Sequence, residues 1–421
     1  MNSIHKVLVF LLISQLIVNK RSIAQIKTEP LRFGFEIEDN KKSVSIPFEL
    51  INNLMVVDVL FQGVVPLKFI IDTGVTNTVL IEKLYADVLE IEPDRKMSLV
   101  GAAGGKEVEA FIVNSISINL KGIKGSQIPL LILAEDYLKL EESMGIKVHG
   151  ILGYDLFKNF VVKIDYINHI ITFFEHDKFK KAPWWYRSVD LKVENTKPYI
   201  FQTIMLSDST TINAKLMIDT GASHSLMLHQ NRDSSISIPE NNIRDILGAG
   251  IAGTIEGHVG RVNLVEMEDY QMEEVIARFP DKGFYSEIIE NTERHGTIGG
   301  GILTRFNMYL NYKDERLYIK KNKRFRESFD YNMSGMSVIA MGELFLKPYY
   351  VIEEIRENTP ASRVDLKAKD VILEMNGYYG RELNLSKINE ILTSKPGRKI
   401  KLKIKRDNQE FMVEFRLEAF I

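Results

Sequence analysis

Cysteine is absent from this chain of 421 residues. Its absence excludes disulfide bonds, thiolate metal sites, cysteine-protease chemistry and lipid attachment through an N-terminal cysteine. Stability must therefore come from a hydrophobic core, for which 45% hydrophobic and 26% charged residues are adequate. The length allows roughly two to four domains.

A large net charge of either sign is also missing. The formal charge is −2, and loss of residues 1–24 would remove Lys6, Lys20 and Arg21 but no acid, which changes it to −5. A mildly acidic chain argues against a nucleic-acid partner. The His-Glu-x-x-His spacing of zinc peptidases is absent as well, so we expect no metal and no other cofactor.

Long hydrophobic runs are scarce. The run at 7–18 follows Lys6 and precedes the small residues of 22–24, which predicts a secretory signal peptide over 1–24, cleaved after Ala24. A transmembrane anchor is the alternative, but about 12 residues are fewer than the roughly 20 that span a bilayer. We therefore expect an exported protein, periplasmic or secreted, with no stable membrane span after cleavage.

From about residue 45 onward, short apolar runs alternate with Gly, Asn and Asp, a pattern typical of β-structure. Two of these runs lead directly into the triplet Asp-Thr-Gly, which begins at Asp72 and again at Asp219. In each case a strand would deliver one carboxylate to a tight turn that glycine permits. One such triplet would be an ordinary turn, but two with matching flanks predict a pair.

The two triplets belong to an internal repeat, since Asp72 and Asp219 are 147 positions apart. Three further landmarks recur in the same order at offsets of 147 or 146: Gly101 with Gly248, 149–153 with 295–299, and 160–166 with 306–312. We therefore predict two corresponding lobes, at 31–185 and 186–327, followed by a third unit at 328–421.

Two carboxylates brought together at a lobe interface would share one proton, because both cannot ionise at short distance. The ionised partner could then take a proton from a water molecule while the other donates to an amide carbonyl. The turn glycines could donate amide hydrogens, and the hydroxyl residues could orient the carboxylates or join the turns. The predicted supporting residues are Thr73, Gly74, Thr76, Thr220, Gly221 and Ser223.

The order Asp-Thr-Gly, Gly-rich hairpin and apolar-apolar-Gly, repeated once, resembles the aspartic peptidases of the pepsin and retropepsin type, in their two-lobed single-chain bacterial form. The resemblance implies a mostly β fold of two duplicated lobes with Asp72 and Asp219 as the catalytic residues. It also implies that the Gly-rich hairpins form flaps over a peptide substrate. The flap and substrate residues so implied are Val100, Gly101, Ala102, Gly104, Gly248, Ala249 and Gly250.

The third unit contains strand patterns at 350–355, 370–377 and 399–405, with a helix predicted over 385–392. It resembles a PDZ domain, a partly open α+β barrel that binds a peptide end between an edge strand and a helix. The groove residues implied are Gly335, Met336, Ser337, Val338, Leu385 and Ile388. The alternative is a domain that packs on the lobes and binds nothing.

Several other features favour structural roles. Residues 248–253 satisfy the glycine pattern of dinucleotide sites, but a poor helix follows them, so we expect no nucleotide. His149 and His295 occupy matching positions in the repeat and are expected to be structural. A packing or surface role is also expected for His224, and the tryptophans at 184–185 are expected to pack at the lobe junction.

These patterns predict an exported aspartic endopeptidase that acts on peptides or proteins, with a PDZ-like unit for substrate recruitment or gating. The alternative from another class is a non-catalytic bilobal protein that binds peptides in its cleft and through the PDZ-like unit. A further possibility is a self-inhibited enzyme whose cleft is gated by the PDZ-like unit or the N-terminal segment.

Overall fold

The structure, a computed structural model, describes residues 33–100, 107–230, 232–250, 253–282, 292–342 and 348–421. Strands dominate them, and the longest α-helix in the described part is α7 (Leu385–Leu392). The mostly β fold predicted from the alternating apolar runs is confirmed.

The first lobe is organised around one sheet with the strand order β3-β4-β5-β12-β6-β11-β8-β7, and β9 pairs with β4. The strands are β3 (Glu49–Ile51), β4 (Leu54–Phe61), β5 (Val65–Ile71), β6 (Thr78–Leu80), β7 (Arg95–Val100), β8 (Glu107–Ile116), β9 (Ile118–Asn119), β11 (Ile128–Leu133) and β12 (Gly150–Leu152). The other elements are β1 (Gly34–Ile37) paired with β10 (Ile123–Ser126), and the helices α2 (Leu84–Val88), α3 (Leu140–Met144) and α4 (Tyr154–Phe157).

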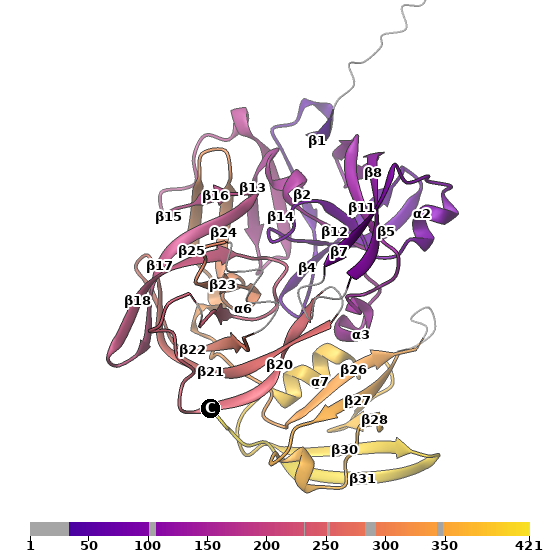
Figure 1. Ribbon diagram of the computed structural model, residues 1–421, viewed down its shortest axis with the longest axis vertical. Helices are drawn as coiled ribbons and strands as arrows, with labels where there is room; N and C mark the ends of the chain where they lie inside the picture. Colours follow the sequence, from indigo (N-terminus) through magenta and orange to yellow (C-terminus); the bar gives the residue numbers. More distant parts are fainter. Residues whose placement is uncertain (1–32, 101–106, 231, 251–252, 283–291, 343–347) are drawn as a thin grey trace, which may run out of the picture. The chain divides into compact units, whose positions relative to one another are not determined.

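The second lobe repeats this topology strand for strand, with the order β16-β17-β18-β23-β19-β22-β21-β20 (Figure 1). Its elements are β16 (Lys192–Glu194), β17 (Lys197–Ser207), β18 (Thr210–Ile218), β19 (Leu226–Leu228), β20 (Asn242–Gly250), β21 (Gly253–Met267), β22 (Tyr270–Pro280), β23 (Gly296–Ile298) and α6 (Gly300–Leu303). The duplication inferred from the sequence is therefore a duplication of fold.

A six-stranded sheet with the order β15-β25-β24-β13-β14-β2 joins the lobes. Its strands are β15 (Arg187–Asp190), β25 (Arg316–Lys321), β24 (Phe306–Asn311), β13 (Phe160–Asp165), β14 (Ile170–Glu175) and β2 (Ser43–Pro47). At its centre β13 pairs with β24 in antiparallel register, with Lys163 opposite Tyr309. Because these residues correspond in the repeat, a pseudo-twofold axis passes between them.

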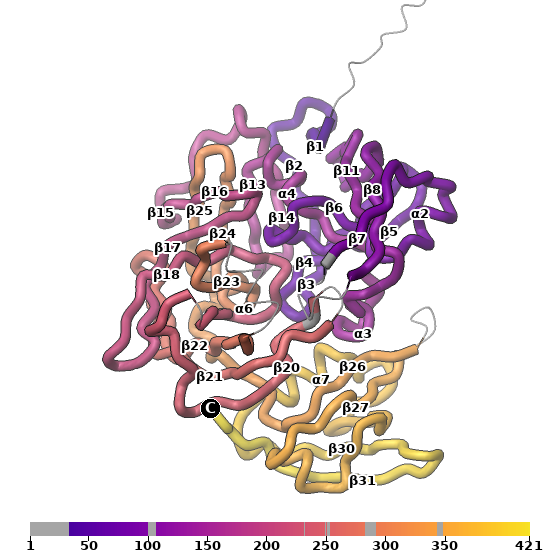
Figure 2. Tube along the Cα trace, viewed as in Figure 1, coloured from indigo at the N-terminus to yellow at the C-terminus, as the bar shows by residue number. Residues whose placement is uncertain are grey.

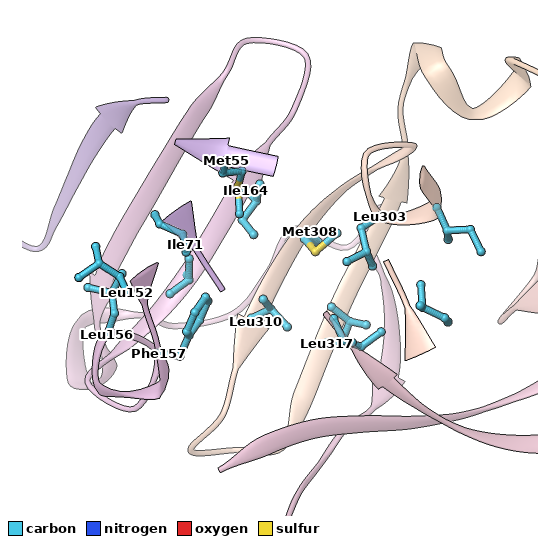
Figure 3. Close-up of a cluster of buried hydrophobic side chains, with 14 of the residues drawn as sticks. Met55, Ile71, Leu152, Leu156, Phe157, Ile164, Leu303, Met308, Leu310 and Leu317 are labelled. Carbon is cyan, nitrogen blue, oxygen red and sulfur yellow. The ribbon is translucent and has the colours of Figure 1, made fainter. Parts of the chain in front are cut away.

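One hydrophobic core extends through both lobes across this sheet. Figure 3 shows Ile71, Leu152 and Phe157 of the first lobe beside Leu310 and other residues of the second. All these side chains are fully buried. Burial on this scale, about 25 cal/mol per Å² of apolar surface, fixes the lobes together without cross-links.

The third unit has its own sheet, with the order β26-β27-β28-β30-β31 and β29 paired with β28 (Figure 2). The strands are β26 (Met336–Met341), β27 (Tyr349–Ile355), β28 (Val371–Met375), β29 (Tyr378–Tyr379), β30 (Lys399–Arg406) and β31 (Gln409–Arg416). Asn384 caps α7 by accepting a hydrogen bond from the Lys387 amide, and the apolar face of the helix packs on the sheet.

The prediction for the two tryptophans is wrong. Trp184 is 84% exposed and Trp185 is 48% exposed, and the two rings contact each other edge to face. The neighbouring hydrophobic cluster is filled instead by Tyr309, Val161 and Ala182. Within the described residues, none of the helices has the length and apolar character needed to cross a bilayer.

Candidate active site

Each Asp-Thr-Gly turn follows the end of a buried strand and is held by a second strand beside it. The Asp72 amide donates to the Leu152 carbonyl oxygen at 3.0 Å, and the Asp219 amide donates to that of Ile298 at 2.9 Å. A glycine, Gly153 or Gly299, directly follows each supporting strand. A β-carbon at Gly153 would lie 2.6 Å from the Val75 carbonyl oxygen, so only glycine allows this close approach.

The two turns are joined beneath the carboxylates by a symmetric set of four hydrogen bonds. Thr73 Oγ1 donates to the Ile218 carbonyl oxygen at 2.7 Å and accepts from the Thr220 amide at 3.0 Å. Thr220 Oγ1 donates to the Ile71 carbonyl oxygen at 2.9 Å and accepts from the Thr73 amide at 3.1 Å. Both threonines are buried, so these bonds fix one turn relative to the other.

This arrangement brings Asp72 and Asp219 into direct contact. The Gly74 amide donates to Asp72 Oδ1 at 2.5 Å, and the Gly221 amide donates to Asp219 Oδ1 at 2.9 Å. A β-carbon at Gly221 would lie 2.1 Å from Asp72 Cγ, so the carboxyl group of each lobe rests against the turn of the other. A hydrogen bond also joins the two carboxyl groups.

Burial raises the pKa of both carboxyl groups. Repulsion by Asp219 and the hydrogen bond between the carboxyls raise the pKa of Asp72 further, well above its usual range. The pKa of Asp219 is raised less. Asp219 accepts the hydrogen bond from Asp72, and this bond lowers its pKa, as do the nearby positive charges of Arg294 and Lys197. The pair therefore favours a state in which the two carboxyl groups share one proton.

The sequence reasoning missed Lys197 and Arg294. Lys197 begins β17 and donates from Nζ to Thr76 Oγ1 at 3.1 Å, across the lobe interface. Arg294 precedes β23, and its Nη1 lies 2.9 Å from Met217 Sδ. Neither belongs to a motif. Only a comparison of the two halves of the repeat could have indicated them, because the corresponding residues of the first lobe, Leu54 and Val148, are apolar.

Two hairpin turns also cross the interface. Asn53 Nδ2 donates to the Ser223 carbonyl oxygen at 3.1 Å, and Thr196 Oγ1 lies 2.9 Å from Thr76 Oγ1. The partners of Thr76 are therefore groups of the second lobe, whereas the sequence reasoning gave this hydroxyl to a carboxylate. These contacts position the Asp-Thr-Gly turns indirectly, because they hold the residues after each turn against the opposite lobe.

A cavity of about 430 Å³ opens beside the dyad, with Asp72, Thr76 and Gly221 in its wall. The rest of the lining is almost entirely apolar and comes from the first lobe; it includes Leu54, Ile70, Val79, Leu99, Leu131 and Leu140. Such a cavity suits one apolar side chain of a bound peptide.

The predicted flap residues are only partly described. Gly101, Ala102 and Gly104 lie outside the described residues, as does the side chain of Val100. Gly248, Ala249 and Gly250 form the end of β20, which pairs with β21 as a hairpin. Strand β21 follows these glycines, so they do not open a helix as a dinucleotide fingerprint would require.

The histidines of the repeat have matching structural contacts. His149 Nδ1 accepts from the Lys68 amide and His295 Nδ1 accepts from the Lys215 amide, both at 3.0 Å. Burial lowers the pKa of His224 to about 3, so this ring is neutral. No group of residues suited to hold a metal ion occurs in the described part of the chain.

Comparisons with known proteins agree with this geometry. Residues 57–156 match the family model of the aspartyl proteases, and residues 335–417 match that of the PDZ domains. The chain combines an aspartyl-protease-like domain with a PDZ domain. The protease match lies within the first lobe, and the second lobe is related to it by the repeat.

No curated protein sequence matches the chain. Among solved structures, basic 7S globulin from soybean matches with 8% sequence identity and a TM-score of 0.40, over 67% of this chain and 95% of that protein. At this level the match carries no information on function.

The predicted groove of the PDZ domain lies between β26 and α7, and α3 of the protease lobe packs against β26. A β-carbon at Gly145, just after α3, would lie 3.3 Å from Leu385 Cβ and 3.7 Å from Ala340 Cβ. Figures 1 and 2 both show α3 beside α7 and β26. A segment of the first lobe therefore contacts both sides of this groove.

The other predicted groove residues lie within the PDZ domain. Gly335 has a φ of +83°, and a β-carbon there would collide with Thr359. Met336 and Ile388 are buried, while Ser337 and Val338 are half-buried in β26. The Met336 amide already donates to Ser334 Oγ at 3.1 Å, so it is not free to bind a peptide carboxylate.

Proposed function

We propose that this protein is an exported aspartic endopeptidase in which Asp72 and Asp219 activate one water molecule. Asp219, the more readily ionised carboxylate, takes a proton from the water as its oxygen attacks the amide carbon. Asp72 donates its proton to the carbonyl oxygen, which gives a neutral tetrahedral diol. Proton return from Asp219 to the amide nitrogen then releases the amine, and the diol hydroxyl restores the Asp72 proton.

The observation that carries this proposal is the contact between the two carboxyl groups in a buried site. Forcing two acids together is unfavourable unless one is protonated, and a protein that only binds peptides gains nothing from it. The four threonine hydrogen bonds beneath them hold this arrangement against the repulsion. The apolar cavity beside Asp72 supplies a place for a substrate side chain.

The PDZ domain is proposed to gate the cleft. It contacts α3, and Leu140 of that helix lines the cavity beside Asp72. It also contacts the hairpin strand β20 of the second lobe, where Arg356 Nη1 lies 3.0 Å from Asp245 Oδ2. Movement of the PDZ domain would therefore shift Leu140 in the cavity wall and the strand β20 that ends in the predicted flap residues 248–250. Recruitment of substrate by the groove first requires that α3 leave it.

The catalytic proposal is tested with residues 25–421 and a mixed peptide library, scored by mass spectrometry between about pH 3 and 8. Wild-type protein is expected to cleave internal peptide bonds, and Asp72→Asn to cleave none. Cleavage by Asp72→Asn would refute the proposed dyad. Tight peptide binding without cleavage by the wild type would favour the non-catalytic binder.

The gating proposal uses the absence of cysteine. In Gly145→Cys/Ala340→Cys the two β-carbons would be 3.7 Å apart, within the range of about 3.5 to 4.5 Å for a disulfide. Oxidation would lock α3 to the PDZ domain and is expected to slow cleavage, which reduction would restore. The single variant Gly145→Cys controls for strain at this left-handed residue. Equal rates in both redox states would leave the PDZ domain a packing unit.

Export is proposed from residues 1–24 alone. When the full chain is expressed with its own leader, the secreted or periplasmic fraction should contain a protein that begins at Gln25. A protein retained in the cytoplasm with Met1 intact would contradict this.

A further inference from the structure

The two walls of the cleft have corresponding backbones but opposite chemistry. Strand pairing fixes the correspondence, because Val56 lies opposite Ile70 in the first lobe as Tyr199 lies opposite Met217 in the second. Leu54 and Lys197 each lie two residues before these paired positions. A buried apolar residue of the first lobe is thus replaced by a lysine in the second.

The same replacement occurs beside the other supporting strand. Val148 lies two residues before Gly150, where β12 begins, and Arg294 lies two residues before Gly296, where β23 begins. Val148 is buried in the hydrophobic cluster that also contains Leu54. Two apolar residues that pack together in the first lobe therefore correspond to two cations in the second.

Neither cation is neutralised by an ion pair within the described part of the chain. Lys197 is half-buried, and its recorded hydrogen bond is to a neutral hydroxyl, that of Thr76. Arg294 is half-buried, and its Nη1 contacts the neutral sulfur of Met217. Its buried Nε has no hydrogen-bond partner among the described residues. The dyad offers the two cations one negative charge between them, so a ligand carboxylate would balance the second positive charge and lower the cost of its partial burial.

Both cations act electrostatically on the dyad. Lys197 interacts electrostatically with both aspartates, and Arg294 with Asp219 and with Lys197. Mutual repulsion between Lys197 and Arg294 adds to the advantage of an anion between them. Lys197 reaches the edge of the first-lobe cavity through Thr76, but the rest of the lining of that cavity is almost entirely apolar.

We propose that the cleft selects peptides with an apolar residue on the first-lobe side of the scissile bond and a carboxylate on the second-lobe side, bound by Lys197 and Arg294. This inference rests on the proposed peptidase function and names its substrate class. The carboxylate can be a Glu or Asp side chain, or the C-terminus of a short peptide. Both sources share the chemistry that the two cations recognise.

The test uses matched peptides that differ only in the residue after a Leu, with Glu, Gln or Lys at that position and amidated C-termini. A fourth peptide has Gln there and a free C-terminal carboxylate close by. We expect kcat/KM for the Glu peptide to exceed that of the Gln peptide by about 10-fold or more, as for a hydrogen-bonded charge pair. Preference for the free C-terminus over Glu would identify a peptide end as the carboxylate source.

Lys197→Leu, which gives the second lobe the residue of the first, and Arg294→Met should each remove most of the Glu preference. The preference is the ratio of kcat/KM for the Glu and Gln peptides within one variant, so it is independent of any change in overall rate that these charges cause through the dyad. Lys197→Arg should keep the preference, which separates loss of charge from damage to the fold. Lys124→Met, an exposed lysine of β10 outside the cleft, is the matched charge control and should change nothing.

Binding distinguishes failure of this inference from failure of the peptidase proposal. Fluorescence anisotropy with Asp72→Asn measures cleft affinity without cleavage, and the Glu peptide should bind about 10-fold tighter than the Gln peptide at low salt. If the wild type cleaves nothing, the peptidase proposal fails while this binding comparison still decides the selectivity. Equal affinities for the Glu, Gln and free-carboxylate peptides would overturn the inference.

Discussion

The two lobes have the same strand order and the same turns, yet they surround their aspartates differently. The first lobe places an apolar cavity beside Asp72, whereas the second lobe contributes two cations, Lys197 and Arg294, both of which act on Asp219. The two lobes thus share the backbone of the site and differ in the side chains around it. This inequality favours Asp72 as the protonated partner in the mechanism that we propose, and it underlies the proposed substrate selectivity.

The largest expected effect comes from the same substitution in each turn. A β-carbon at Gly221 would lie 2.1 Å from Asp72 Cγ, and one at Gly74 would lie 2.9 Å from the Asp219 carboxylate oxygens. Gly221→Ala should therefore displace the opposite carboxyl group and lower kcat by about 100-fold or more, since misplacement by about 1 Å has this cost.

Gly74→Ala is the matched variant of the first lobe and should lose less activity, because its clash is smaller. Steady-state kinetics, with circular dichroism to confirm folding, measure both. Equal losses in the two variants would show that the turns are more alike than their contacts indicate.

The threonines should respond equally, because their hydrogen bonds are symmetric. Thr73→Val or Thr220→Val would leave one buried carbonyl and one buried amide without a partner, at a cost of about 2 to 4 kcal/mol in stability. Calorimetry should show a similar fall in unfolding temperature for both. Thr73→Ser keeps the hydroxyl and should lose much less; a large difference between the two valine variants would contradict the symmetry.

The stability of the two lobes at low pH should also differ, although this effect is smaller than those of the turn and threonine variants. Burial lowers the pKa of His229 to about 3, from an ordinary value of 6.5. The unfolded chain then binds more protons between these values, so the stability present above pH 6.5 is lost as the pH falls toward 3. The residue of the first lobe that corresponds to His229 is Ile81. The Ile81 amide donates to the His149 carbonyl oxygen, as the His229 amide donates to the His295 carbonyl oxygen.

His229→Ile should therefore lower the midpoint of acid unfolding by several tenths of a pH unit. Hydrogen exchange followed by mass spectrometry would assign the gain to peptides of the second lobe. Unchanged exchange there on acidification would refute the difference in acid stability.

The fold could be predicted because the repeat has strong local signals. Asp-Thr-Gly, the apolar strands and the glycines after them are set by turn and strand chemistry within a few residues. The residues of the dyad followed from the same signals. The paired threonines beneath it, Thr73 and Thr220, were also within reach, because they belong to the triplets themselves.

The rest of the site depends on contacts between segments that no local pattern encodes. Lys197 reaches Thr76 across the interface, and its correspondence with Leu54 is hidden by a change of offset between the first hairpins of the lobes. The contact of Gly145 with Leu385 joins two domains, so neither domain alone predicts it. The exposure of Trp184 shows that residue type does not decide burial when other aromatics fill the junction.

A double-mutant cycle on the two aspartates tests the central claim most directly, namely that the unequal lobes contribute to one shared acid-base pair. Asp72→Asn and Asp219→Asn should each lower kcat by at least about 10³-fold, and the double variant should lose hardly more than either, because residues that act as a unit are not additive. Independent, multiplicative losses, or substantial activity in either single variant, would contradict the account.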